Sequence, residues 1–162
     1  MASTQLTLNQ TTLLGATTGT ISCLLAPLAG KQLLLPSVTV AEVVAAHDLK
    51  AAPSGSPAWK LGAIRFQETD VPVISFEVLN GQALPNKIEH IAIVNSISGQ
   101  RDLPRYGVVV QGSPRLAKVK IAELEDLESA PVGPVEFLQV RYSGELAVIP
   151  DLDSVESQLL AN

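Results

Sequence analysis

The stretch from Pro57 to Gly81, PAWKLGAIRFQETDVPVISFEVLNG, decides the fold class of this chain. Apolar side chains dominate two runs, 61–66 and 71–78, and the polar segment 67–70 separates them. Runs rich in β-branched and aromatic residues with a turn between them are typical of a β-hairpin. We therefore expect two buried strands here. The stretch contains no nucleophile paired with a base, no metal-binding cluster and no phosphate-binding loop.

The same pattern continues along most of the chain. Turn formers such as Gly30 and Ser143-Gly144 separate neighbouring apolar runs roughly every 8–12 residues, which is typical of sandwiches and barrels. The further runs lie at 21–28, 32–35, 38–44, 88–97, 106–111, 116–121, 135–140 and 145–149. The sequence therefore predicts an all-β fold of nine or ten short strands, arranged as two packed barrels.

Three shorter segments carry more specific expectations. Within the run 38–44, we expect Val38, Val40 and Val43 to face inward. The acidic segment 122–129 fits either one helical turn or an extended edge. After Pro150, Asp153 is followed three residues later by Glu156, which resembles an N-terminal capping pattern. This pattern predicts a short C-terminal helix that carries the apolar residues Val155, Leu159 and Leu160.

The composition limits the kinds of partner. Against 16 Asp and Glu there are 11 Lys and Arg, so the net charge is −5, and no basic run appears. A nucleic-acid partner needs a concentrated positive surface and is not expected. No apolar stretch reaches the roughly 20 residues that span a bilayer, and the first 30 residues lack the basic start of a secretory signal. We expect a cytoplasmic protein with a loosely ordered tail over 1–19 and one domain over 20–162.

Side chains that could carry catalysis or hold a metal do not form a recognisable site. Cys23 is the only cysteine, which excludes an internal disulfide and a cysteine-based zinc site. The acidic group at 123–128 lacks the alternating ligands and central glycine of a calcium loop. No G-x-S-x-G elbow accompanies His47 or His90. We expect a binding module without enzyme activity, cofactor or metal; the rival is a small-ligand sensor or enzyme that uses either histidine.

Four segments in the right order resemble the CheW-like domains of bacterial chemosensory adaptors. Trp59-Lys60-Leu61-Gly62 followed by Val71-Pro72-Val73-Ile74 is similar to the family signature W-x-x-G…V-P-V-V. Val40-Ala41-Glu42-Val43 is similar to its V-x-E-[IV] element. Tyr106-Gly107-Val108-Val109-Val110 resembles a later strand, and 146–152 resembles the closing strand and the start of the helix. The resemblance extends from about Thr20 to Leu160.

This resemblance implies two intertwined five-stranded SH3-like barrels with a short C-terminal helix. It also implies a non-enzymatic adaptor that links the cytoplasmic tip of methyl-accepting chemoreceptors to the regulatory domain of a CheA-type histidine kinase. In the family the V-x-E element contacts the kinase, which points here to Val40, Glu42 and Val43. The receptor-facing turn corresponds to Phe66, Gln67 and Glu68.

Several positions depart from the family pattern. Gln67-Glu68 stands where the family has Arg-Gly, Ser75 and Gln111 stand where it has aspartate, and Pro150 replaces a leucine. The receptor contact departs most from the family pattern, because the amide of Gln67 cannot replace the bidentate guanidinium of the family's arginine. This divergence is most similar to the branch of the family that serves type IV pili and twitching motility. The alternative role is a one-sided structural or inhibitory partner that competes with CheW.

Overall fold

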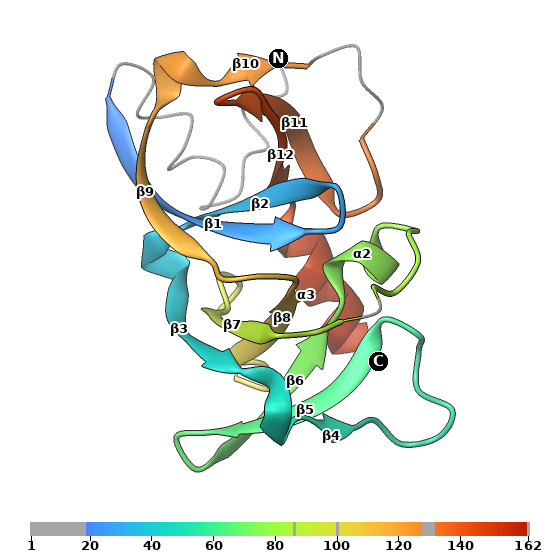
Figure 1. The fold of residues 1–162 in the computed structure, drawn as a ribbon. Coiled ribbons are helices and arrows are strands. Elements are labelled where there is room, and N and C mark those ends of the chain that lie inside the picture. The colour runs from blue at the N-terminus through green and yellow to red at the C-terminus, as the bar shows by residue number, and fades with distance from the viewer. Residues whose placement is uncertain (1–18, 86, 100, 128–131, 162) are drawn as a thin grey trace.

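The chain forms two six-stranded β-sheets, so the all-β fold class is confirmed. The computed structural model describes residues 19–85, 87–99, 101–127 and 132–161. The first sheet lies in the upper half of Figure 1 and has the order β10-β11-β12-β2-β1-β9. Its strands are β1 (Thr20–Leu28), β2 (Lys31–Pro36), β9 (Arg115–Lys120), β10 (Glu125–Asp126), β11 (Glu136–Tyr142) and β12 (Glu145–Pro150).

The second sheet lies below the first in Figure 1 and has the order β3-β7-β8-β6-β5-β4. Its strands are β3 (Val40–Ala45), β4 (Lys50–Ala51), β5 (Lys60–Phe66), β6 (Thr69–Ile74), β7 (His90–Asn95) and β8 (Arg105–Val110). Two helices, α2 (Phe76–Leu79) and α3 (Leu152–Ala161), follow β6 and β12. Short 3₁₀ turns η2 (Ser37–Thr39), η3 (Ala46–Asp48) and η4 (Ile121–Glu123) complete the described elements.

Each sheet curls around a core of its own, and we call the two units barrel A (β1, β2 and β9–β12) and barrel B (β3–β8). The five longer strands of each sheet all contribute side chains to that core, and the sixth strand has only two residues. The two five-stranded barrels expected from the resemblance are therefore present, each extended by one short edge strand. Barrel B lies in the chain between β2 and β9 of barrel A, so the two units are intertwined.

A third and larger cluster fills the space between the barrels. It contains side chains from β1, β2, β7 and β8, together with Leu152, Val155 and Leu159 of α3. The same four strands also supply the two barrel cores, so they are buried on both faces. A strand buried on both faces needs a continuous apolar run instead of an alternating one. This explains the runs Leu33-Leu34-Leu35 and Val108-Val109-Val110.

The two barrels have the same internal topology. In each, a hairpin (β1–β2 or β7–β8) pairs with an edge strand (β9 or β3). A second hairpin (β11–β12 or β5–β6) joins the first through a parallel pair and is followed by a helix. The 3₁₀ turns η4 and η3 also occupy equivalent positions before the two-residue strands. The fold is thus a structural duplication that the sequence alone did not display.

Four local expectations need correction, two of them in the first half of the chain. Val38 is 77 % exposed, because η2 follows Pro36 and turns Thr39 inward, where its Oγ1 donates to the Pro36 carbonyl over 2.7 Å. The second run of the opening hairpin ends as a strand at Ile74. Ser75 then caps α2, since its Oγ accepts from the Val78 N–H at 3.2 Å.

The C-terminal helix is present, but its cap differs from the expected one. Asp151 caps it by accepting from the Ser154 N–H at 3.2 Å and the Ser154 hydroxyl at 2.8 Å. Val155 and Leu159 are buried as expected, whereas Leu160, at the margin of the buried helical face, is 42 % exposed. The acidic segment forms both η4 and the edge strand β10. The expected tail lies outside the described residues except for Gly19, whose carbonyl accepts from the Ile121 N–H.

Candidate partner-binding sites

The predicted kinase contact lies on β3, the outermost strand of its sheet. Val40 and Val43 are half-buried and pack against the central cluster, while Glu42 is exposed. In a regular strand, residues three apart face opposite sides. Here the register with β7 shifts between Val40 and Glu42, so a bulge at Ala41 brings both valines against the same cluster. The result is an exposed carboxylate between two anchored valines at a free sheet edge.

The predicted receptor contact is the turn between β5 and β6. Phe66 pairs with Thr69, and Gln67 and Glu68 between them are exposed, with φ angles of 50° and 66°. Positive φ at both central residues is the geometry of a two-residue hairpin turn that normally selects Asn-Gly. The equivalent turn in barrel A has Ser143-Gly144, with φ of 52° and 80°. Barrel A therefore uses glycine where barrel B holds two side chains in a strained conformation.

The three residues predicted for the receptor contact do not have the same accessibility. Phe66 is 9 % exposed and belongs to the core of barrel B. The Arg105 guanidinium lies 5.4 Å from the centre of its ring, a distance at which a cation is attracted to an aromatic face. Arg105 Nε also donates to Asn95 Oδ1 at 3.1 Å. Phe66 thus fixes the base of the turn, and of the three residues only Gln67 and Glu68 have exposed side chains.

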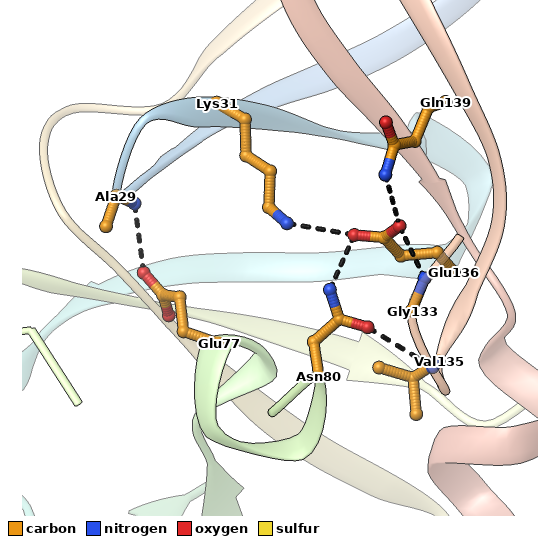
Figure 2. Close-up of polar contacts among 8 residues, drawn as sticks. All are labelled: Ala29, Lys31, Glu77, Asn80, Gly133, Val135, Glu136 and Gln139. Atoms are coloured by element: carbon orange, nitrogen blue, oxygen red, sulfur yellow. Dashed lines mark hydrogen bonds and ion pairs between the residues drawn. The ribbon is translucent and has the colours of Figure 1, made fainter. Parts of the chain in front are cut away.

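A buried polar cluster ties the two barrels together (Figure 2). The Glu136 carboxylate, on β11 of barrel A, accepts from Lys31 Nζ at 2.8 Å and from Asn80 Nδ2 at 2.5 Å. Its other oxygen accepts from the Gly133 N–H and from Gln139 Nε2, both at 2.8 Å. Asn80 follows α2 of barrel B and also accepts from the Val135 N–H at 3.4 Å. We call this group the Glu136 cluster; it links the end of α2 to two strands of barrel A.

The Glu136 carboxylate remains ionised in this setting. Its side chain is 1 % exposed and that of Lys31 is 7 % exposed. Burial raises the pKa of Glu136, but hydrogen bonds from Lys31, Gln139, Gly133 and Asn80 outweigh it and lower the pKa from 4.5 to about 2. A buried charge is tolerable only when it is paired and hydrogen-bonded. The contact between the barrels therefore depends on this carboxylate having all its partners.

Two further carboxylates each accept hydrogen bonds from the backbone of a hairpin in the other barrel. Glu77 of α2 accepts from the Ala29 N–H, in the β1–β2 turn, at 3.1 Å. Glu156 of α3 accepts from the N–H groups of Ile97 and Ser98, after β7, at 2.9 and 3.0 Å. Tyr106 also donates to Glu156 at 3.0 Å, and burial together with this carboxylate raises the pKa of Tyr106 well above 10. The two helices therefore make equivalent contacts across the barrel interface.

The residues considered for catalysis do not converge. His47 Nε2 lies 3.4 Å from the carboxylate of its exposed neighbour Asp48. His90 Nδ1 lies 3.0 Å from the Gly112 carbonyl, a backbone contact that orients the ring. Cys23 is buried, which raises the pKa of its thiol to about 11. Among the described residues no His, Cys, Asp and Glu side chains gather into a possible metal site, and no helix there is long and apolar enough to cross a membrane.

Comparison with known proteins agrees with this architecture. Residues 22–159 match the family described as the CheW-like domain. The chain belongs to the CheW-like family. The structure resembles that of the scaffolding protein TtCheW from Thermoanaerobacter tengcongensis, with a TM-score of 0.67 over 82 % of this chain and 85 % of that one. Sequence identity is 19 %, so this likeness shows a shared fold, and no curated protein matches the chain significantly by sequence.

The CheW-like family consists of scaffolding proteins, so the chain is not an enzyme, as its sequence predicted. One departure from the family pattern is compatible with the local structure. Ser75 replaces an aspartate but still caps α2 through its hydroxyl, and both residue types are favoured at helix N-caps. A second departure leaves a polar group unsatisfied, since Gln111 Nε2 is buried without a hydrogen-bond partner. The Glu136 cluster had no sequence signal, because Lys31 and Glu136 are 105 residues apart.

We predict that Glu136→Gln lowers the free energy of unfolding by about 3 kcal/mol, because it leaves the buried Lys31 ammonium without a counter-charge. Urea unfolding at neutral pH measures the effect. Glu125→Gln is the matched control, since its ion pair with Arg141 is exposed and its loss should cost under about 0.5 kcal/mol. Equal unfolding midpoints for the two variants would contradict the role given to Glu136.

The same carboxylate makes stability depend on pH. Its folded pKa lies below the unfolded value, so its contribution is complete above about pH 5 and is lost as the pH falls toward 2. The shift corresponds to about 3 kcal/mol. Urea unfolding from pH 6 to pH 2 should show this loss in the wild-type protein and a smaller loss in Glu136→Gln. An unchanged pH profile in the variant would assign the acid sensitivity to other groups.

We also predict that relieving the strained turn stabilises the protein. Gln67→Asn combined with Glu68→Gly should raise the free energy of unfolding by about 1 kcal/mol, because these residues adopt positive φ at less cost. Ser143→Asn in the equivalent turn of barrel A is the control, since Gly144 is already present there. A gain no larger than that of the control would show that the turn is not strained.

Proposed function

We propose that this protein is a chemotaxis-type adaptor that connects chemoreceptors to a CheA-type histidine kinase. The observation that carries this proposal is that the two candidate contacts belong to one hydrogen-bonded sheet. Exposed Glu42 lies on the edge strand β3, and the exposed turn Gln67-Glu68 projects from β5 and β6 of the same sheet. Partners bound at these two places would be held in a fixed spacing. Family membership and the scaffolding description of TtCheW support this role.

The kinase contact is assigned to Val40, Glu42 and Val43, and the partner domain to the regulatory domain of the kinase. The half-buried valines support this assignment, because their backbone and β-carbons are fixed by packing against the central cluster. A fixed apolar surface next to an exposed charge loses little entropy on binding. The receptor contact is assigned to the exposed Gln67 and Glu68, with Phe66 as the residue that supports them.

We further propose that the protein works in a cytoplasmic chemosensory system that controls type IV pili and twitching motility. Among the proteins of such systems it is most similar to ChpC. Departures from the common CheW pattern support this placement, above all Gln67-Glu68 in the receptor-facing turn. Disruption of the encoding gene should then alter twitching while leaving swimming unchanged. Normal twitching with altered swimming would place the protein in a flagellar system instead.

We predict that Val40→Ala combined with Glu42→Arg reduces capture of the kinase regulatory domain at least about tenfold, a loss typical of central interface residues. Pull-down or calorimetric titration with the purified domain measures this effect. Glu123→Arg is the control, because it makes the same charge reversal on an exposed residue of η4 in barrel A. Thermal unfolding of each variant separates loss of binding from loss of fold. Undiminished capture would remove β3 from the kinase contact.

The alternative is a one-sided partner that binds the kinase and displaces CheW. It differs from the adaptor in the complexes that it allows. An adaptor forms a ternary complex with a receptor cytoplasmic fragment and the kinase, which size-exclusion chromatography detects as one co-eluting peak. A competitor releases CheW from the kinase and recruits no receptor. Release without a ternary complex would replace the adaptor role with the competing one.

A further inference from the structure

A shallow groove runs over the outer face of β4, β5 and β6, next to the receptor-facing turn. Its volume is about 310 Å³, and its uncharged floor includes Gly62, Ala63 and Pro72. Lys50 of β4 and Lys60 of β5 line it as well. We call this feature the lysine groove; nothing in the sequence analysis or the family comparison assigned a role to it.

Gly62 lines the groove at a position where only glycine fits beside β4. Ala51 of β4 pairs with Gly62, and Lys50 pairs with Ala63, which in turn pairs with Pro72 of β6. A Cβ at position 62 would lie 1.8 Å from the Lys50 carbonyl oxygen, so any other residue would force β4 away. The small side chains of this floor let a partner segment approach the sheet closely.

The charge of the groove is positive, although the protein as a whole is acidic. Neither lysine takes part in the ion pairs found among the described residues. The one carboxylate that lines the groove, Asp70, already contacts Arg65 at 3.4 Å. Both ammonium groups are therefore available to a ligand, within a protein of net charge −5.

Lysines on a sheet edge often serve only to keep the edge solvated. Here Lys50 and Lys60 flank the lysine groove, which has an uncharged floor and lies near the strained turn of the same hairpin. Asp70 lines the end of the groove and pairs with Arg65, so only the pair of Phe66 with Thr69 separates the groove from the turn at Gln67-Glu68. Backbone strain is often retained at binding surfaces, and here it lies beside a positive groove.

We propose that the lysine groove binds a carboxylate-rich segment of the same partner that docks on the Gln67-Glu68 turn. This inference rests on the proposed receptor contact and adds the chemistry of the partner: an acidic stretch of protein beside the docking point. Lys50 and Lys60 are its specificity-determining residues. The interaction is electrostatic and partly exposed, so salt weakens it.

The test is charge reversal with a matched control. Lys50→Glu with Lys60→Glu should weaken binding of a purified receptor cytoplasmic fragment at least about tenfold and flatten its dependence on salt. Lys118→Glu with Lys120→Glu makes the same charge change on exposed residues of β9 in barrel A and should weaken binding less than about twofold. Lys50→Gln with Lys60→Gln should give an intermediate loss. If groove and control variants bind equally, the inference is wrong and the receptor contact stands.

A second measurement separates failure of the inference from failure of the proposed function. Hexaglutamate peptide is titrated into the ¹⁵N-labelled full chain and followed by amide chemical shifts. We expect saturable shifts at Ala51, Gly62 and Ala63, and their loss in Lys50→Glu with Lys60→Glu. If the receptor fragment binds no variant while these shifts persist, the proposed receptor role is wrong but the acidic-ligand groove stands. Absence of the shifts in the wild-type protein overturns the groove.

Discussion

A carboxylate buried between two barrels must have all its hydrogen bonds satisfied, and this requirement constrains how the two barrels pack against each other. Glu136 has four donors, which come from the β1–β2 hairpin, the end of α2, the loop before β11 and β11 itself. Three of these donors belong to barrel A with Glu136 itself, and the fourth, Asn80 of barrel B, can reach the carboxylate only if the two barrels pack in one orientation. Apolar packing fills the space between the barrels, but it is not directional. The hydrogen bond from Asn80 to Glu136 is directional, so it helps to fix the orientation of barrel B, which carries both candidate contacts, relative to barrel A.

The sequence predicted the strands well because apolar runs and turn formers are local signals. The central strands were recognisable as continuous runs such as Ile91-Ala92-Ile93-Val94, although only the structure shows that both faces are buried. The α2 helix was missed, because Phe76 and Val78 continue the alternation of the preceding strand and its cap, Ser75, is also compatible with a strand. The duplication was missed as well, because equivalent strands share topology without sharing sequence.

The candidate site was only partly predictable for a similar reason. The position of the receptor-facing turn followed from its polar residues, but its strain did not, since Gln and Glu rarely adopt positive φ. The partners that Glu77, Glu136 and Glu156 have in distant parts of the chain lie 48 to 105 residues away. No pattern within a short window reports such pairs. The lysine groove required the register of three strands, which places Lys50 beside Ala63 and Pro72.

The insertion of barrel B into barrel A has a consequence for how the chain folds. Residues 40–110 form barrel B without any strand from elsewhere, whereas β1 of barrel A must pair with β9, which follows that whole segment. Closing such a long loop is entropically costly while it is unfolded. Once barrel B has formed, its two ends are already near each other, because Cys23 of β1 pairs with both Pro36 and Ala117. The part of the chain that carries both candidate contacts and the lysine groove is thus also the part that can fold first and template the other barrel.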